Sequence, residues 1–108
     1  HDTPAYYSKL EELDGYIARI VSAVKEAGMY DDTIFIITSD HGGIKKGHGG
    51  KTMAEMQTPF IIAGKNIKKA GEFQESMVQY DVSATMTYIF GLELPQVWTG
   101  RAMKQVFK

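Results

Sequence analysis

The sequence of 108 residues contains no cysteine, and this absence excludes disulfide bonds, thiolate nucleophiles and cysteine zinc sites together. Long apolar runs are absent as well. The longest, Ile34–Ile37 and Phe60–Ala63, are far too short to cross a bilayer. No signal peptide is visible, and the chain begins at His1 without an initiator methionine. We therefore expect a fragment or a processed piece of a longer protein.

An excess of charge is also missing, because the formal net charge is only −1. The chain has no basic field that would attract nucleic acid or an anionic membrane surface. An anionic substrate must then be held by a local site, such as bound metal ions. Apolar residues make up 44% of the chain and charged residues 23%, which is an ordinary globular composition. A chain of this length suffices for a single domain with one core.

The order of the expected elements predicts the α/β class. Between the helix start at Asp2-Thr3-Pro4 and the stop at Gly28, apolar residues recur at helical spacing. This stripe, expected to pack on a flat surface, comprises Tyr6, Leu10, Leu13, Ile17, Ile20, Val21 and Val24. Residues 33–38 form a continuous β-branched and aromatic run, which is typical of a strand buried on both faces. A second strand is expected at 59–63, and a helix capped by Asp81 is expected to end near Gly91. We expect a layered, mostly parallel sheet flanked by helices.

The loop from Ser39 to Gly50 holds five glycines and two of the three histidines. Asp40 and His41 stand at the carboxyl end of the first strand, where ligands gather in open parallel sheets. A carboxylate beside an imidazole suits a divalent metal such as zinc. His48 follows between two glycines, which let the backbone approach an ion closely. Asp40, His41 and His48 are therefore the candidate metal ligands.

Simpler readings of this loop exist. An Asp-His pair often only bonds the backbone of a turn, and a histidine between glycines is often a surface residue. The clustering after a buried strand favours a metal or acid/base site, although the residues alone leave the reaction open. Gly49-Gly50-Lys51-Thr52 resembles the end of a phosphate-binding P-loop. The glycine required five positions before Gly50 is Lys45, however, and Pro59 interrupts the helix that should follow.

Taken together, these motifs resemble a known family. Ser39-Asp40-His41-Gly42, then Gly47-His48-Gly49, then Glu55 with Thr58–Gly64, is similar to the C-terminal part of the alkaline phosphatase superfamily. The type I phosphodiesterase/nucleotide pyrophosphatase branch is the most similar. Residues 80–85 and the closing segment to Arg101 resemble the family too, so the resemblance covers nearly the whole chain.

The resemblance implies a fragment of a two-metal hydrolase that cleaves small-molecule phosphate esters, with phosphodiesters or pyrophosphates favoured. Two divalent ions, usually zinc, would clamp the transferring group. Asp40 and His41 would bind the ion that also holds the nucleophile, and His48 would bind the other ion. Relatives are often exported, so the resemblance favours a periplasmic or secreted location.

The family's nucleophile and first metal-binding aspartate belong to a region upstream of this chain. No catalytic nucleophile is therefore expected here, and the missing N-terminal part of the same enzyme is the expected partner. We expect residues 1–108 alone to be inactive. No ligand role is assigned to His1 or Asp2, which are expected to form a solvated start. Glu55 is expected to orient the site rather than to bind an ion.

Lys51 has two interpretations: a contact to an anionic substrate, as in related sulfatases where a lysine follows the metal loop, or a solvated loop residue. Two alternatives remain for the whole chain. The first is a sulfatase of the same superfamily. The second is a non-catalytic module that uses this surface to bind a partner.

Overall fold

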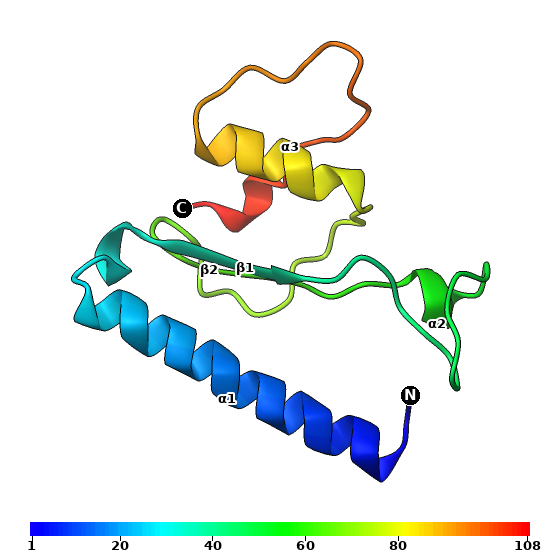
Figure 1. The fold of residues 1–108 in the computed structure, drawn as a ribbon. Coiled ribbons are helices and arrows are strands. Elements are labelled where there is room, and N and C mark those ends of the chain that lie inside the picture. The colour runs from blue at the N-terminus through cyan, green and yellow to red at the C-terminus, as the bar shows by residue number, and fades with distance from the viewer. The chain divides into compact units, whose positions relative to one another are not determined.

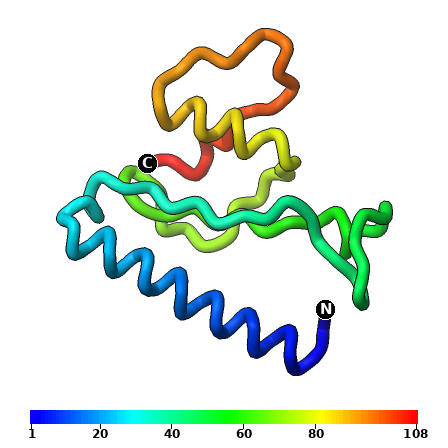
Figure 2. The backbone as a smooth tube through the Cα atoms, in the orientation of Figure 1, coloured from blue at the N-terminus to red at the C-terminus, as the bar shows by residue number.

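A computed structural model describes all residues from 1 to 108, and Figures 1 and 2 follow its backbone. The chain forms two compact units, residues 1–65 and residues 66–108. All residues with buried side chains belong to the second unit. The expected organisation as one domain stays a prediction, whereas the expected mixture of helices and strands is confirmed.

Helix α1 (Pro4–Glu26) begins and ends as the sequence predicts. The Thr3 hydroxyl caps it by accepting from the backbone N–H of Tyr6 at 3.1 Å, and Pro4 occupies the first turn. After the helix, Gly28 adopts a φ of 73°, which favours glycine. No residue of α1 is buried. In the apolar stripe, Ile17, Val21 and Val24 are half-buried and the other residues are exposed, so the expected packing on a flat surface is only partial.

Strands β1 (Ile34–Thr38) and β2 (Phe60–Gly64) pair antiparallel, with Ile36 opposite Ile62. The expectation of a mostly parallel sheet is not met by this two-stranded sheet. The physical reason is the connection: it doubles back to β1 without the helical crossover that a parallel neighbour requires. Most of β1 is half-buried rather than buried on both faces, because it has one neighbouring strand.

The connection carries an element that the sequence did not predict. A single turn of helix, α2 (Met53–Met56), lies in the loop beyond the ends of the two strands (Figure 1). At the opposite ends of the strands, a short 3-10 helix, η1 (Tyr30–Asp32), leads into β1. There the ammonium of Lys65 binds the carboxylate of Asp32 at 2.7 Å. The hydrogen bond and charge of Lys65 lower the pKa of Asp32, and the reciprocal interaction raises the pKa of Lys65.

In the second unit, α3 (Tyr80–Ile89) joins the closing segment, which ends in the 3-10 helix η2 (Lys104–Val106). Asp81 was expected to cap α3 from outside, but the helix starts one residue earlier and Asp81 is fully buried in its first turn. Its carboxylate accepts from the backbone N–H groups of Val78 and Arg101 at 2.9 and 2.8 Å. The buried hydroxyl of Thr85 donates to the Asp81 carbonyl and accepts from the Met103 N–H. None of the helices combines the length and apolarity needed to cross a membrane.

Candidate metal centre

The candidate ligands stand on a loop that α2 holds from one side. The backbone N–H of Gly42 donates to the carbonyl of Glu55, and that of Gly43 donates to the carbonyl of Ala54, each at 2.8 Å. A Cβ added at Gly42 would overlap the carbonyl oxygen of Ala54. A glycine is therefore required directly after His41, since any side chain would push the loop away from α2.

Asp40 and His41 present two donor atoms side by side. The Oδ2 atom of Asp40 lies 3.6 Å from the Nε2 atom of His41, and Asp40 is 86% exposed at its side chain. Two ligand atoms bound to one tetrahedral ion at about 2.1 Å lie roughly 3.4 Å apart. The spacing therefore fits shared binding of a divalent cation. The Nδ1 atom of His41 lies 2.6 Å from the carbonyl oxygen of Gly42, and protonation there leaves the Nε2 lone pair free.

The side chain of His48 lies against that of His41, on the other side of the loop. The two imidazole rings stack with their centroids 4.2 Å apart and their planes inclined by 22°. Ring nitrogens direct their lone pairs within the ring plane, so the two histidines aim at separate positions. Residues 1–108 contain no group of three or more His, Asp or Glu side chains arranged to hold one ion. Because a catalytic zinc ion takes three protein ligands, Asp40 and His41 fit such a cation as part of a ligand set.

His1 was expected to form a solvated start, and the structure corrects this expectation, whereas the absence of a ligand role for His1 stays a prediction. Its side chain is half-buried, with the ring against Gly43, where a Cβ would overlap it. The ring also lies 5.1 Å from that of Tyr6. All three histidines thus contact or belong to the same loop. The sequence signal was only that these are the chain's sole histidines. Asp2 is exposed and accepts a hydrogen bond from the Tyr7 hydroxyl.

Glu55 closes the other side of the loop. Its carboxylate accepts from the hydroxyl of Thr52 at 2.7 Å and from the backbone N–H of Gly50 at 3.1 Å. These bonds, with the one from Thr52 first, lower the pKa of the carboxyl group. Thr52 and Glu55 form the reciprocal cap of α2 that Thr-x-x-Glu sequences favour. Lys51, between Gly50 and Thr52, is exposed.

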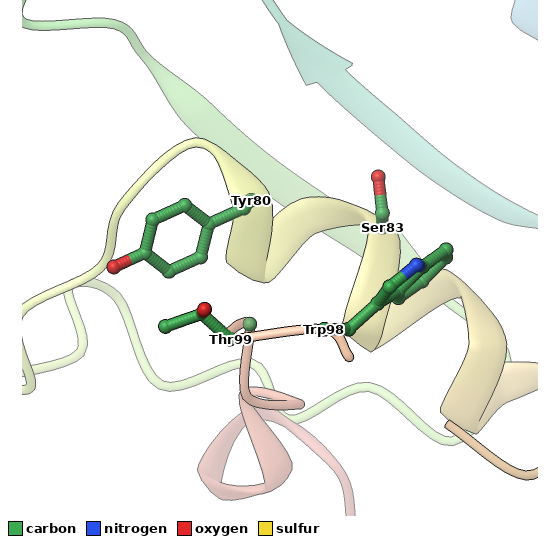
Figure 3. Close-up of a pocket in the computed structure, with 5 residues that line it drawn as sticks. Tyr80, Ser83, Trp98 and Thr99 are labelled. Atoms are coloured by element: carbon green, nitrogen blue, oxygen red, sulfur yellow. The ribbon is translucent and has the colours of Figure 1, made fainter. Parts of the chain in front are cut away.

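A separate hollow of about 240 Å³ lies in the second unit and is lined by Tyr80, Ser83, Trp98, Thr99 and Gly100. Figure 3 shows the rings of Tyr80 and Trp98 with the hydroxyls of Ser83 and Thr99 around it. None of these side chains carries a formal charge or is a usual metal ligand.

Comparison with known proteins identifies the family of this chain. Residues 1–92 match the family described as Sulfatase. The chain belongs to the sulfatase family. This family lies within the superfamily that the sequence motifs predicted, so the resemblance is confirmed at that level.

Three curated relatives illustrate the similarity of this sulfatase-family chain to known proteins. The chain is 29% identical over 100 residues to the extracellular sulfatase SULF-1 homolog of Drosophila melanogaster, covering 87% of this chain and 9% of that protein. It is 28% identical over 103 residues to arylsulfatase K of Xenopus laevis, covering 91% and 19%. It is 31% identical over 106 residues to the multifunctional alkaline phosphatase superfamily protein PehA of Trinickia caryophylli, covering 91% and 20%. No solved structure matches the chain significantly.

These relatives change the order of the sequence-based readings. The sulfatase alternative is better supported than the phosphodiesterase or nucleotide pyrophosphatase branch. The chain spans only about a tenth to a fifth of the length of these relatives. Activity, substrate and partners of the whole protein are therefore matters for proposal.

Proposed function

We propose that this chain is part of a metal-dependent sulfatase in which Asp40 and His41 bind one divalent cation. The observation that carries the proposal is the 3.6 Å spacing of Asp40 Oδ2 and His41 Nε2, with the other ring nitrogen of His41 directed at the Gly42 carbonyl. Membership of the sulfatase family supports it. The substrate class is a small-molecule sulfate ester, and the reaction is its hydrolysis.

Each residue of the loop has its own role in this proposal. When bound, the cation supplies positive charge that stabilises the negative charge developing on the ester. Asp40 contributes a formal negative charge to the cation, and the Gly42 carbonyl fixes the orientation of the His41 ring. Lys51, which is exposed next to Gly50, offers an ammonium to the negatively charged sulfate group of the ester. The nucleophile and the remaining ligands are proposed to come from other parts of the enzyme.

His48 is proposed to bind a second cation, and both ions are proposed to be zinc. Supporting this, the near-parallel rings of His41 and His48 direct their lone pairs in separate planes, which disfavours one shared ion. Elemental analysis of the purified full-length protein tests the number and identity of the ions. A fall from two ions to one in the His48→Ala variant supports two metals. If the wild type holds a single ion and the His48→Ala variant retains it, the proposed role of His48 would change from metal binding to substrate binding.

Turnover of chromogenic esters tests the activity. We expect the full-length protein to hydrolyse 4-nitrophenyl sulfate, and we expect Asp40→Asn and His41→Ala to reduce kcat/KM by at least about 100-fold, because each removes a ligand. Residues 1–108 alone should show no turnover. A full-length protein that binds metal but cleaves none of the esters tested would instead support a non-catalytic interaction module.

Hydrolysis of phosphate esters is the second candidate. It is favoured by the similarity to PehA and by 33% identity over 100 residues to the 2,3-bisphosphoglycerate-independent phosphoglycerate mutase of Vibrio vulnificus, covering 87% of this chain and 18% of that protein. The same assay with 4-nitrophenyl phosphate and bis(4-nitrophenyl) phosphate decides between the two. A higher kcat/KM for either phosphate than for the sulfate would replace the leading proposal.

An extracytoplasmic location is supported by the similarity to two relatives whose names describe them as an extracellular sulfatase homolog and a putative extracellular sulfatase homolog. We propose that the whole protein is exported. Fractionation of the source cells, with antibody detection of the protein, tests this. Recovery only in the cytosolic fraction would contradict it.

A further inference from the structure

We propose that Glu55 is the positioning residue that holds the segment 48–51 beside Asp40 and His41. This inference rests on the proposed function, because it assigns Glu55 a role in the activity of that loop. Its physical basis is that one short element, α2, is hydrogen-bonded to both arms of the loop. The first arm contains Gly42 and Gly43, and the second arm is the segment 48–51. The carbonyls of Ala54 and Glu55 bind the first arm at Gly43 and Gly42, and the side chain of Glu55 binds the second arm at Gly50.

The second arm depends on this carboxylate. Reciprocal backbone hydrogen bonds between Ile44 and Gly47 end the paired part of the loop before His48. Within residues 48–51, the backbone N–H of Gly50 is the one that makes a hydrogen bond, and its acceptor is Glu55 Oε1 at 3.1 Å. Gly49 adds conformational freedom, since its φ of 91° lies in the region open to glycine. Without the carboxylate, the segment loses its hydrogen bond to α2 and keeps the covalent link through Thr52 and the stacking of His48 on His41.

The carboxylate is itself held in place. Glu55 Oε2 accepts from the Thr52 hydroxyl at 2.7 Å, so both carboxylate oxygens have partners within the chain. Glu55 is also half-buried, unlike the exposed Asp40, His41 and His48. A carboxylate with both oxygens engaged is suited to fixing a backbone segment and poorly suited to binding a cation. His48 and Lys51 lie within two residues of Gly50, so Glu55 acts on the site through them.

The test uses the full-length protein and three variants: Glu55→Ala, Glu55→Gln and Glu72→Ala. Glutamine keeps a carbonyl oxygen for the Gly50 N–H, whereas alanine removes the acceptor. Glu72 is an exposed glutamate outside this loop and serves as the control. The readouts are kcat and KM on 4-nitrophenyl sulfate, metal content, and hydrogen exchange at the Gly50 amide.

We expect Glu55→Ala to lower kcat/KM by about 10- to 100-fold, the range typical of residues that orient a metal site. The Gly50 amide should exchange at least about tenfold faster, and the cation at Asp40 and His41 should be retained. Glu55→Gln should recover activity to within about threefold of wild type, and Glu72→Ala should match wild type. If Glu55→Ala does not fold, Thr52→Val, which removes one partner of the carboxylate, should shift kcat/KM and exchange in the same direction by a smaller factor.

Two results would overturn the proposal. One is wild-type exchange at Gly50 in Glu55→Ala. The other is a Glu55→Gln variant as inactive as Glu55→Ala while Gly50 stays protected, because the negative charge itself would then be required. Failure of the proposed function is distinguishable: the wild-type protein would cleave no sulfate ester, whereas hydrogen exchange at Gly50 would still report whether Glu55 holds the segment.

Discussion

The carboxylate of Asp81 accepts a hydrogen bond from the backbone N–H of Arg101 over 2.8 Å, although the two residues stand 20 positions apart in the chain. The second oxygen of the same carboxylate accepts from the N–H of Val78 at 2.9 Å. Asp81 is fully buried, so it connects the start of α3, the turn before it and the closing segment in one place. The second unit is therefore stabilised by a buried polar group as well as by its small apolar core.

Asp81→Ala should destabilise the protein by about 3 kcal/mol, because the backbone N–H groups of Val78 and Arg101 lose their acceptor in two part-buried hydrogen bonds and a fully buried side chain is removed. Urea unfolding followed by circular dichroism measures the change. Asp14→Ala, at an exposed position of α1, is the control and should change stability by less than about 0.5 kcal/mol. Equal stability of the Asp81 and Asp14 variants would show that the buried carboxylate contributes nothing.

Gly42→Ala should disrupt the loop from Ser39 to Gly50, whereas Gly47→Ala should be tolerated. A Cβ at Gly42 would overlap the Ala54 carbonyl, while at Gly47 the nearest atom is the Ile44 carbonyl oxygen at 3.9 Å. We expect Gly42→Ala to lower the metal affinity of the full-length protein by at least about tenfold, because the shift moves the adjacent His41. Titration with zinc in the presence of a competing chelator measures this. Similar losses in both variants would contradict the steric argument.

Gly15→Ala should stabilise α1 by about 0.5 to 1 kcal/mol. Gly15 lies in the helix interior, and an added Cβ would meet nothing within 4 Å, so alanine gains helix propensity without a clash. Gly28→Ala is the matched control, since its site is equally open but its φ is 73°. It should destabilise the protein by about 1 kcal/mol. Thermal unfolding of both variants tests the pair, and changes of the same sign would refute it.

The Asp32–Lys65 pair should give the hairpin a pH-dependent stabilisation. Lys65 lowers the pKa of Asp32 in the folded state, so the contribution is complete above the ordinary carboxyl pKa near 4 and is lost as the pH falls through the lower folded value. Wild type should exceed Lys65→Met in stability at pH 6, and the difference should vanish at about pH 2. It should also shrink in 1 M salt, because both side chains are exposed. A difference that persists at low pH would rule out the ion pair as its source.

Local chemistry by itself determined several features of this protein. The Thr3-Pro4 start and the Gly28 stop define α1, and the β-branched run before Thr38 defines β1, because caps and propensities act within a few residues. Asp40 and His41 are neighbours in the chain, so a shared position for them was predictable. The motifs around them also indicated the superfamily.

Only the tertiary structure decided the features that depend on chain reversal. The antiparallel pairing of β1 with β2, the stacking of His48 on His41 and the position of His1 against Gly43 join residues whose separation no periodicity encodes. Asp81, expected from the sequence only to cap a helix, was found to bind the backbone N–H of Arg101 as well. The sequence could not indicate this partner, because it is remote in the chain. Non-local contacts depend on how loops close, and α2 sets the closure of the loop from Ser39 to Gly50 through hydrogen bonds between Glu55 and both Gly42 and Gly50.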